Sequence, residues 1–254
     1  MNSSITPKTK GFAIIRKLLV AAFWLGMWQL AFVLVKSGLL LPSPYQTLLR
    51  LFELAGTVDF WLKCLLSLLR IVEGFLLGVF AGIVLGVLTF RFRLLKELFE
   101  PAVNIVKSTP VASFIILALV WMSKDGVPVF IAFLMVLPII QANVSEGIRQ
   151  TDKDLLEMAR VFRFSGGKLL AKIYVPAVLP YLFAGSTTAL GFAWKAGVAA
   201  EILSLPAKSI GKELYYSKIY LETTDLFAWS AAVIVMSMLL ERLLIFLLDK
   251  FKQK

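Results

Sequence analysis

The chain has 254 residues, of which 59% are hydrophobic, and it carries a formal net charge of +11. A soluble domain averages about 45–50% apolar residues, so this excess favours a protein embedded in a membrane. The chain has no histidine and one cysteine, Cys64, which excludes an internal disulfide, a Ser-His-Asp catalytic site and most catalytic zinc sites.

A membrane-spanning helix needs about 20 mostly apolar residues. Six segments approach this length, and the sequence predicts one span in each of them: 18–35, 71–90, 105–122, 127–145, 177–200 and 226–248. The first run is longer than a typical secretory signal core, and no small-x-small cleavage site follows it. We therefore expect a tail over residues 1–17 and a single all-α membrane domain over residues 1–254.

Two features of the first half predict how helices are arranged. The prolines in LPSPYQTLLRLFELAGT precede a short amphipathic helix over about 45–56, which is expected to lie along the membrane surface. In the second span, glycines recur every four residues: Gly74, Gly78, Gly82 and Gly86. Because small residues at this spacing share one helix face and let another backbone approach, they predict a helix-packing stripe.

The basic residues predict the orientation of the chain. With the amino terminus placed inside, 17 of the 27 lysines and arginines lie in inside segments and 8 lie in outside segments. The inside segments are 8–17, 91–96, 149–172 and 242–254. Since cytoplasmic loops carry the excess of positive charge, both termini are predicted to be cytoplasmic.

The charged stretch between the fourth and fifth spans has a clear helical pattern. Thr151 is predicted to cap a short helix, with Glu157 and Arg160 paired on its flank. The apolar positions of this helix share one face: Leu155, Leu156, Ala159 and Phe162. A second helix is predicted to begin at Ser165 and to end at Pro176. A helix with a mixed apolar and charged surface predicts a docking site for a partner protein.

This stretch resembles the cytoplasmic loop of permease subunits of binding-protein-dependent ABC importers, whose pattern is E-A-A-x3-G-x9-I-x-L-P. The spacing here is the same throughout, from Glu157 to Pro176. Arg163 replaces the glycine that turns the chain between the two loop helices, so Gly166 and Gly167 are expected to supply a displaced turn. The resemblance implies these residues for docking an ATPase: Leu155, Glu157, Met158, Ala159, Arg160, Phe162, Arg163, Ile173 and Pro176.

The resemblance extends over about residues 40–245. The stretches LPSPYQTL, KSTPVASF, VPAVLPYLFAG and GFAWKAGVAAEIL are similar to the nitrate/sulfonate/taurine branch of these permeases. The resemblance implies a type I ABC importer permease in the bacterial inner membrane, with about six transmembrane helices and a cytoplasmic coupling helix in the loop 146–176. It also implies that two permease copies form the path, two cytoplasmic ATPase subunits dock on the loops, and an external binding protein delivers a small anionic solute.

The chain has no G-x-x-x-x-G-K-[ST] phosphate-binding loop, so it is predicted to be non-catalytic, with ATP used by the partner. We expect no cofactor, metal or nucleic acid on this chain. Two other classes stay open from the residues alone. A self-contained secondary transporter typically shows internal repeats and charges at the midplane, and a small membrane enzyme needs a paired nucleophile and base.

A few charges fall at membrane depth, where they are costly unless they face a cavity, a partner or the interface. Lys195 and Glu201 lie near the outer half of the fifth span, with Trp194 beside the lysine. These three are the predicted pathway residues: Lys195 either attracts an anionic solute or serves as a structural contact, and Trp194 is expected to pack. Arg70 and Glu73 are expected to pair at the start of the second span.

Overall fold

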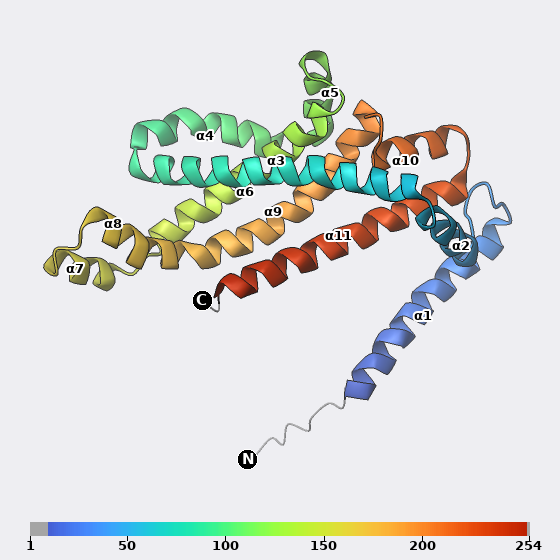
Figure 1. Ribbon diagram of the computed structural model, residues 1–254, viewed down its shortest axis with the longest axis horizontal. Helices are drawn as coiled ribbons and strands as arrows, with labels where there is room; N and C mark the ends of the chain where they lie inside the picture. Colours follow the sequence, from blue (N-terminus) through green and yellow to red (C-terminus); the bar gives the residue numbers. More distant parts are fainter. Residues whose placement is uncertain (1–9, 253–254) are drawn as a thin grey trace.

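The computed structural model describes residues 10–252, and every regular element in that range is a helix (Figure 1). The helices are, in chain order, α1 (Lys10–Val35), α2 (Pro44–Ala55), α3 (Val58–Arg91), α4 (Arg93–Ser108), α5 (Val111–Trp121), α6 (Gly126–Arg149), α7 (Lys153–Val161), α8 (Gly166–Leu169), η1 (Leu170–Tyr174), α9 (Val175–Ser204), α10 (Ile210–Ile219) and α11 (Thr223–Lys252). Residues 1–9 of the predicted tail lie outside the described range.

The centre of the molecule is a group of three long helices in which α6 packs against both α3 and α9. The predicted glycine stripe of α3 lies at the contact with α6. A Cβ atom on Gly78, Gly82 or Gly86 would come 2.6–2.9 Å from a valine or isoleucine Cβ of α6, and one on Gly74 would overlap the carbonyl oxygen of Val129. The stripe therefore brings the two backbones together as expected, and larger residues have no room there.

Five helices in the described range are long and apolar enough to cross a membrane. The predicted span 105–122 is not one of them, and the prediction of a continuous helix there was wrong. The chain breaks at Thr109–Pro110, and α4 and α5 meet at an angle of 109°. Pro110 disfavours helical geometry at Thr109, and the 11 residues of α5 reach only about 16 Å, too short to cross a bilayer. Taken together, α4 and α5 can form a sixth, broken span.

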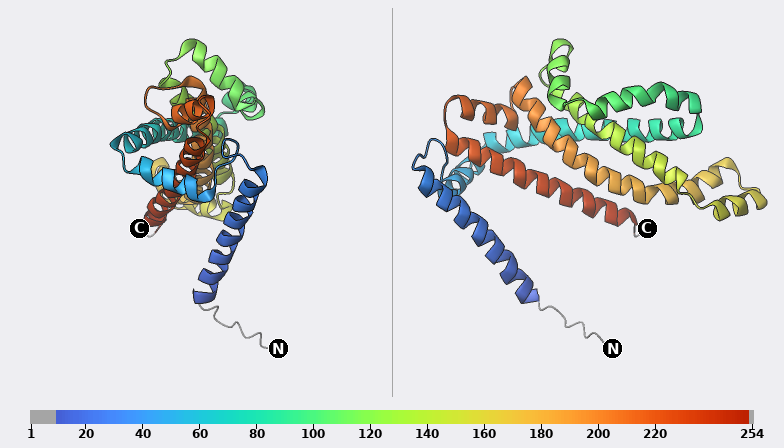
Figure 2. Two further views of the ribbon diagram at one scale, coloured as in Figure 1. Left: turned by 90° about the vertical axis from the view of Figure 1, so that its right-hand side faces the viewer. Right: turned by 180° about the vertical axis from the view of Figure 1, so that it is seen from behind.

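The short helix α2 confirms the predicted helix at 45–56. Ser43 caps it, with the Ser43 Oγ accepting from the Gln46 backbone N–H at 3.1 Å, and Pro44 begins it. Arg50 then donates to both carboxylate oxygens of Asp225 at 2.7 and 2.9 Å, which ties α2 to the start of α11. These hydrogen bonds, with those to Glu53, raise the pKa of Arg50. Figure 1 and the right-hand view of Figure 2 show α2 at the same end of the molecule as α10.

Candidate functional site

Helices α7 and α8 project beyond the ends of α6 and α9 at one extremity of the molecule (Figure 1). We call this extremity the loop end, and the extremity that carries α2 and α10 the opposite end. The chain at the loop end runs from α6 through α7, a turn, α8 and η1 into α9. The charged stretch thus forms a helix-turn-helix outside the three central helices.

Helix α7 begins one residue later than predicted. Thr151 is buried, and its hydroxyl donates back to the Gly147 carbonyl of α6 at 3.3 Å. Asp152 therefore becomes the cap, and its carboxylate accepts from the Asp154 backbone N–H at 2.8 Å. The expectation that Thr151 caps this helix was wrong, because the Thr151 hydroxyl is already bonded to a carbonyl at the end of α6.

The turn after α7 lies at Arg163, where the related family pattern has glycine. Arg163 has a φ of +52°, in the left-handed region. The backbone N–H of Arg163 donates to the Arg160 carbonyl at 3.1 Å, and that of Phe164 donates to the Ala159 carbonyl at 2.9 Å, the two bonds of a Schellman motif. Gly166 lies in α8 and has no positive φ. The displaced turn expected at the glycine pair is therefore wrong, and the arginine itself adopts the strained geometry.

The second loop helix continues into the membrane without a stop. A single helical stretch runs from Gly166 to Ser204, and Pro176 lies in the first turn of α9. The prediction that Pro176 ends the loop helix was wrong. In a regular α-helix a proline ring clashes with the carbonyl group four residues earlier. The π-helical turn η1 lies directly before Pro176 and is wider, with the Val175 N–H donating to the Leu170 carbonyl. This wider turn accommodates the proline. The second loop helix is thus continuous with α9.

The docking residues predicted from the loop divide into two groups. Ala159 and Ile173 are buried, at 2% and 6% exposure. The remaining seven are exposed at the loop end: Leu155, Glu157, Met158, Arg160, Phe162, Arg163 and Pro176. The predicted apolar face is therefore split, because Ala159 turns inward while Leu155 and Phe162 turn outward.

The outward face of α7 carries large apolar side chains that no other part of the described chain covers. Met158 is 43% exposed and Phe162 is 69% exposed, and Val161 beside them is 78% exposed. Glu157 and Arg160, expected to pair, form no ion pair in the described part of the chain. A ridge of exposed apolar groups flanked by unpaired charges is the composition of a helix that binds a protein groove.

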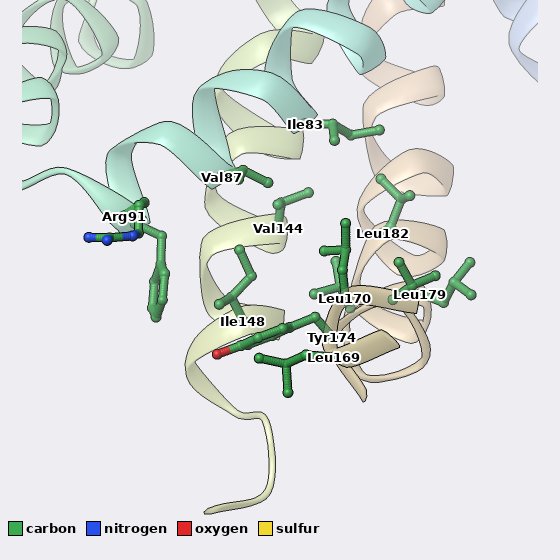
Figure 3. A pocket seen from close by; sticks show the side chains of 13 residues that line it. Ile83, Val87, Arg91, Val144, Ile148, Leu169, Leu170, Tyr174, Leu179 and Leu182 are labelled. Carbon is green, nitrogen blue, oxygen red and sulfur yellow. The ribbon is translucent and has the colours of Figure 1, made fainter. Parts of the chain in front are cut away.

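An apolar cavity of about 670 Å³ lies where the loop meets the central helices. Figure 3 shows aliphatic side chains of α3, α6, η1 and α9 pointing into it, with Tyr174 beside Ile148 and Arg91 at the margin. Leu169 and Leu170 of the second loop helix form part of its wall. The second loop helix and the membrane helices therefore enclose one apolar space, and the loop is linked to α9 through η1.

The three predicted pathway residues point in different directions. Lys195 is exposed on α9. Trp194 is 2% exposed, and its indole N–H donates to the Val233 carbonyl of α11 at 3.2 Å, so it packs as expected. Glu201 is also fully buried. Of the predicted pathway set, Lys195 alone has an exposed side chain.

Glu201 is the centre of a buried polar cluster at the opposite end. Its Oε2 accepts from the Ser67 hydroxyl at 2.8 Å and from the Gly211 backbone N–H at 3.2 Å. Its Oε1 lies 3.4 Å from Arg70, which also bonds Asp125. The expected pairing of Arg70 with Glu73 was wrong, because the Arg70 guanidinium instead binds the carboxylates of Asp125 and Glu201, which are distant in sequence. This cluster joins α3, α6, α9 and α10, and sequence spacing carries no signal of it.

Comparison with known proteins identifies the family of this chain. The chain matches the sequence profile of the binding-protein-dependent transport system inner membrane component family over residues 74–254. The chain belongs to this family. It is therefore a non-catalytic permease subunit of an ABC importer, located in the inner membrane, and its partners are an ATPase and a solute-binding protein. Membership decides against a secondary transporter and a membrane enzyme.

Relatives with known names support the assignment of this permease. A probable ABC transporter permease of Brucella melitensis is 28% identical over 89% of this chain and 92% of its own length. The putative aliphatic sulfonates transport permease SsuC of Bacillus subtilis is 28% identical over 87% and 81%. The bicarbonate transport system permease CmpB of Synechococcus elongatus is 33% identical over 60% and 55%.

The fold of the permease also matches a solved transporter. An inward-facing structure of the MetNI methionine ABC transporter superposes with a TM-score of 0.56 at 18% identity, covering 75% of this chain and 91% of that chain. At this identity the match shows the fold alone. It confirms the predicted type I importer permease architecture.

Proposed function

We propose that two copies of this permease form the path by which a small anionic solute crosses the inner membrane, and that each copy docks one of two ATPase subunits on α7. The observation that carries the proposal is the loop end. There Met158 and Phe162 stand exposed beside Glu157 and Arg160, on a helix joined through η1 to α9. A protein groove that accepts this ridge would remove its apolar surface from water.

The loop end is assigned to the cytoplasm. With this orientation both termini are cytoplasmic and 17 basic residues lie on the inside against 8 on the outside, in agreement with the positive-inside rule. The opposite end, with α2 and α10, then faces the external binding protein. The segment 146–176 serves as the coupling loop, and ATP hydrolysed by the partner moves the membrane helices through it.

The solute is proposed to be an anion of the nitrate, sulfonate or bicarbonate kind. Named relatives are permeases for aliphatic sulfonates, bicarbonate and nitrate, which are all anions. In this chain Lys195 is exposed on α9 between buried neighbours, and a cation at that depth needs water, an anion or a partner. Lys195 is therefore assigned to the path, while Trp194 and Glu201 hold α9 in place behind it.

Co-purification from the native membrane tests the docking element. A tagged wild type is compared with Glu157→Lys, which reverses one charge on α7, and with Glu222→Lys, which makes the same change on an exposed residue at the opposite end. We expect the ATPase to accompany the wild type and Glu222→Lys and to be lost or weakened with Glu157→Lys. Equal recovery of the ATPase with all three proteins would place docking elsewhere, and its absence from the wild type would refute the proposed assembly.

A further inference from the structure

Helix α4 carries polar side chains along one face for its whole length. They recur at three- to four-residue spacing and are all exposed: Arg93, Glu97, Glu100, Asn104, Lys107 and Ser108. Lys96 lies at the edge of this face. Of the partly buried residues of α4, Leu95 and Val106 lie on the opposite side of the helix and Val103 lies at the edge of this face beside Lys96. We call the six exposed residues the polar stripe, and it points away from the rest of its own chain.

We place the polar stripe at membrane depth because α4 packs against α3, which is long and apolar enough to cross a membrane. Helix α4 turns back from the end of α3, runs beside it and contacts both α3 and α6 (Figures 1 and 2). Lys107 follows Arg93 by 14 residues, which places it about 21 Å further along the helix axis. Since the hydrocarbon core is about 30 Å thick, the stripe extends from one boundary of the membrane past its middle. The chain then breaks, and α5 leads away at 109°.

Charges at this depth cannot face lipid tails without a large cost. Arg93 and Glu97 form an ion pair at 2.8 Å. Glu100, Asn104 and Lys107 make no side-chain hydrogen bond or ion pair within residues 10–252. A helix from a second copy would have to supply a matching group for each of them inside the membrane, whereas water solvates all three.

We infer that the polar stripe of α4 lines the water-filled path along which the solute moves, with Lys107 as its deepest charged group. This inference rests on the proposed function, because the path forms between two copies. The positive charge of Lys107 suits a nitrate-, sulfonate- or bicarbonate-like solute. The apolar flank of α4, which includes Leu98 and Ile105, then contacts lipid or the second copy. The path is thus assigned a second set of residues besides Lys195.

Labelling of single cysteines tests the stripe without knowledge of the solute. In a Cys64→Ala background, cysteine replaces Glu100, Asn104 or Ser108 in three stripe variants. Two matched controls place it on the flank at Leu98 and Ile105, which are 65% and 57% exposed in the single chain. The probe is a permanently charged methanethiosulfonate, applied to membrane vesicles that contain the complete transporter.

A thiol reacts as the thiolate, which forms only where water reaches it. We therefore expect stripe cysteines to react at least roughly tenfold faster than flank cysteines. Equal rates at stripe and flank, or no reaction at any stripe position, would overturn the inference. The same vesicles are assayed for the bound ATPase. If the ATPase is bound and the stripe is unreactive, this inference alone fails. If no ATPase accompanies the wild type, the proposed function fails and the inference fails with it.

Discussion

The contact between α3 and α6 makes a quantitative prediction for Gly74→Ala. The added Cβ would lie 2.8 Å from the Ala132 Cβ and would overlap the carbonyl oxygen of Val129. Because a backbone atom cannot rotate aside, the two helices must separate. Overpacking of this kind costs up to about 3 kcal/mol, and the better helix propensity of alanine returns about 1 kcal/mol. The expected net loss is therefore about 2 kcal/mol.

The measurement is the melting temperature of the purified permease in one detergent, monitored by fluorescence-detected gel filtration. For a chain of this length, a loss of 2 kcal/mol lowers Tm by about 4–8 °C. The matched control is Gly191→Ala, also inside a long helix, where a Cβ meets nothing within 4 Å. This variant should keep or slightly raise Tm. If Gly74→Ala melts within about 1 °C of the wild type, which corresponds to a loss of no more than about 0.5 kcal/mol, the close approach of α3 and α6 is not what the stripe provides.

Three further variants test the turn, the buried cluster and the path. Arg163→Gly should stabilise the loop by about 0.5–1 kcal/mol, because glycine adopts a positive φ without strain. Slower amide hydrogen exchange in α7 would show this gain, and the control Arg163→Ala should give none. Unchanged exchange in the glycine variant would count against strain at Arg163. Glu201→Ala leaves the buried donors of Ser67 and Gly211 without an acceptor and should lower the free energy of unfolding by about 3 kcal/mol. This loss should appear as a fall in Tm that the variant Glu73→Ala, at an exposed residue, does not show. An equal fall in both variants would refute the role of the cluster. Lys195→Ala should lower uptake of nitrate, an aliphatic sulfonate or bicarbonate into proteoliposomes about tenfold, the equivalent of ~1.4 kcal/mol, with Lys195→Arg largely active. Unchanged uptake of all three anions would remove Lys195 from the path.

Local sequence determined the parts of this permease that depend on neighbouring residues. Apolar runs located five of the six predicted spans, and a four-residue glycine period located the contact face of α3, since both follow from the geometry of a single helix. The loop pattern from Glu157 to Pro176 located the candidate docking helix. The exposure of Met158 and Phe162 was not readable from that pattern, because the turn at Arg163 decides which side of α7 faces the second loop helix.

Where two local signals competed, the tertiary structure chose between them. Thr151 and Asp152 are both good caps, and the burial of Thr151 against α6 leaves the role to Asp152. The span predicted at 105–122 from apolar composition was wrong, because the chain breaks at Pro110. Pro176 gave the opposite error, because the wide turn of η1 accommodates a proline that would otherwise end the helix.

Contacts between distant residues were decided by the tertiary structure alone. Arg70 has an acidic neighbour three residues away, yet it binds Asp125 and Glu201, which are 55 and 131 residues along the chain. The sequence shows that Glu201 needs a partner at membrane depth. Which partner it obtains depends on how α3, α6 and α9 pack, because that packing sets the distances between the charged groups.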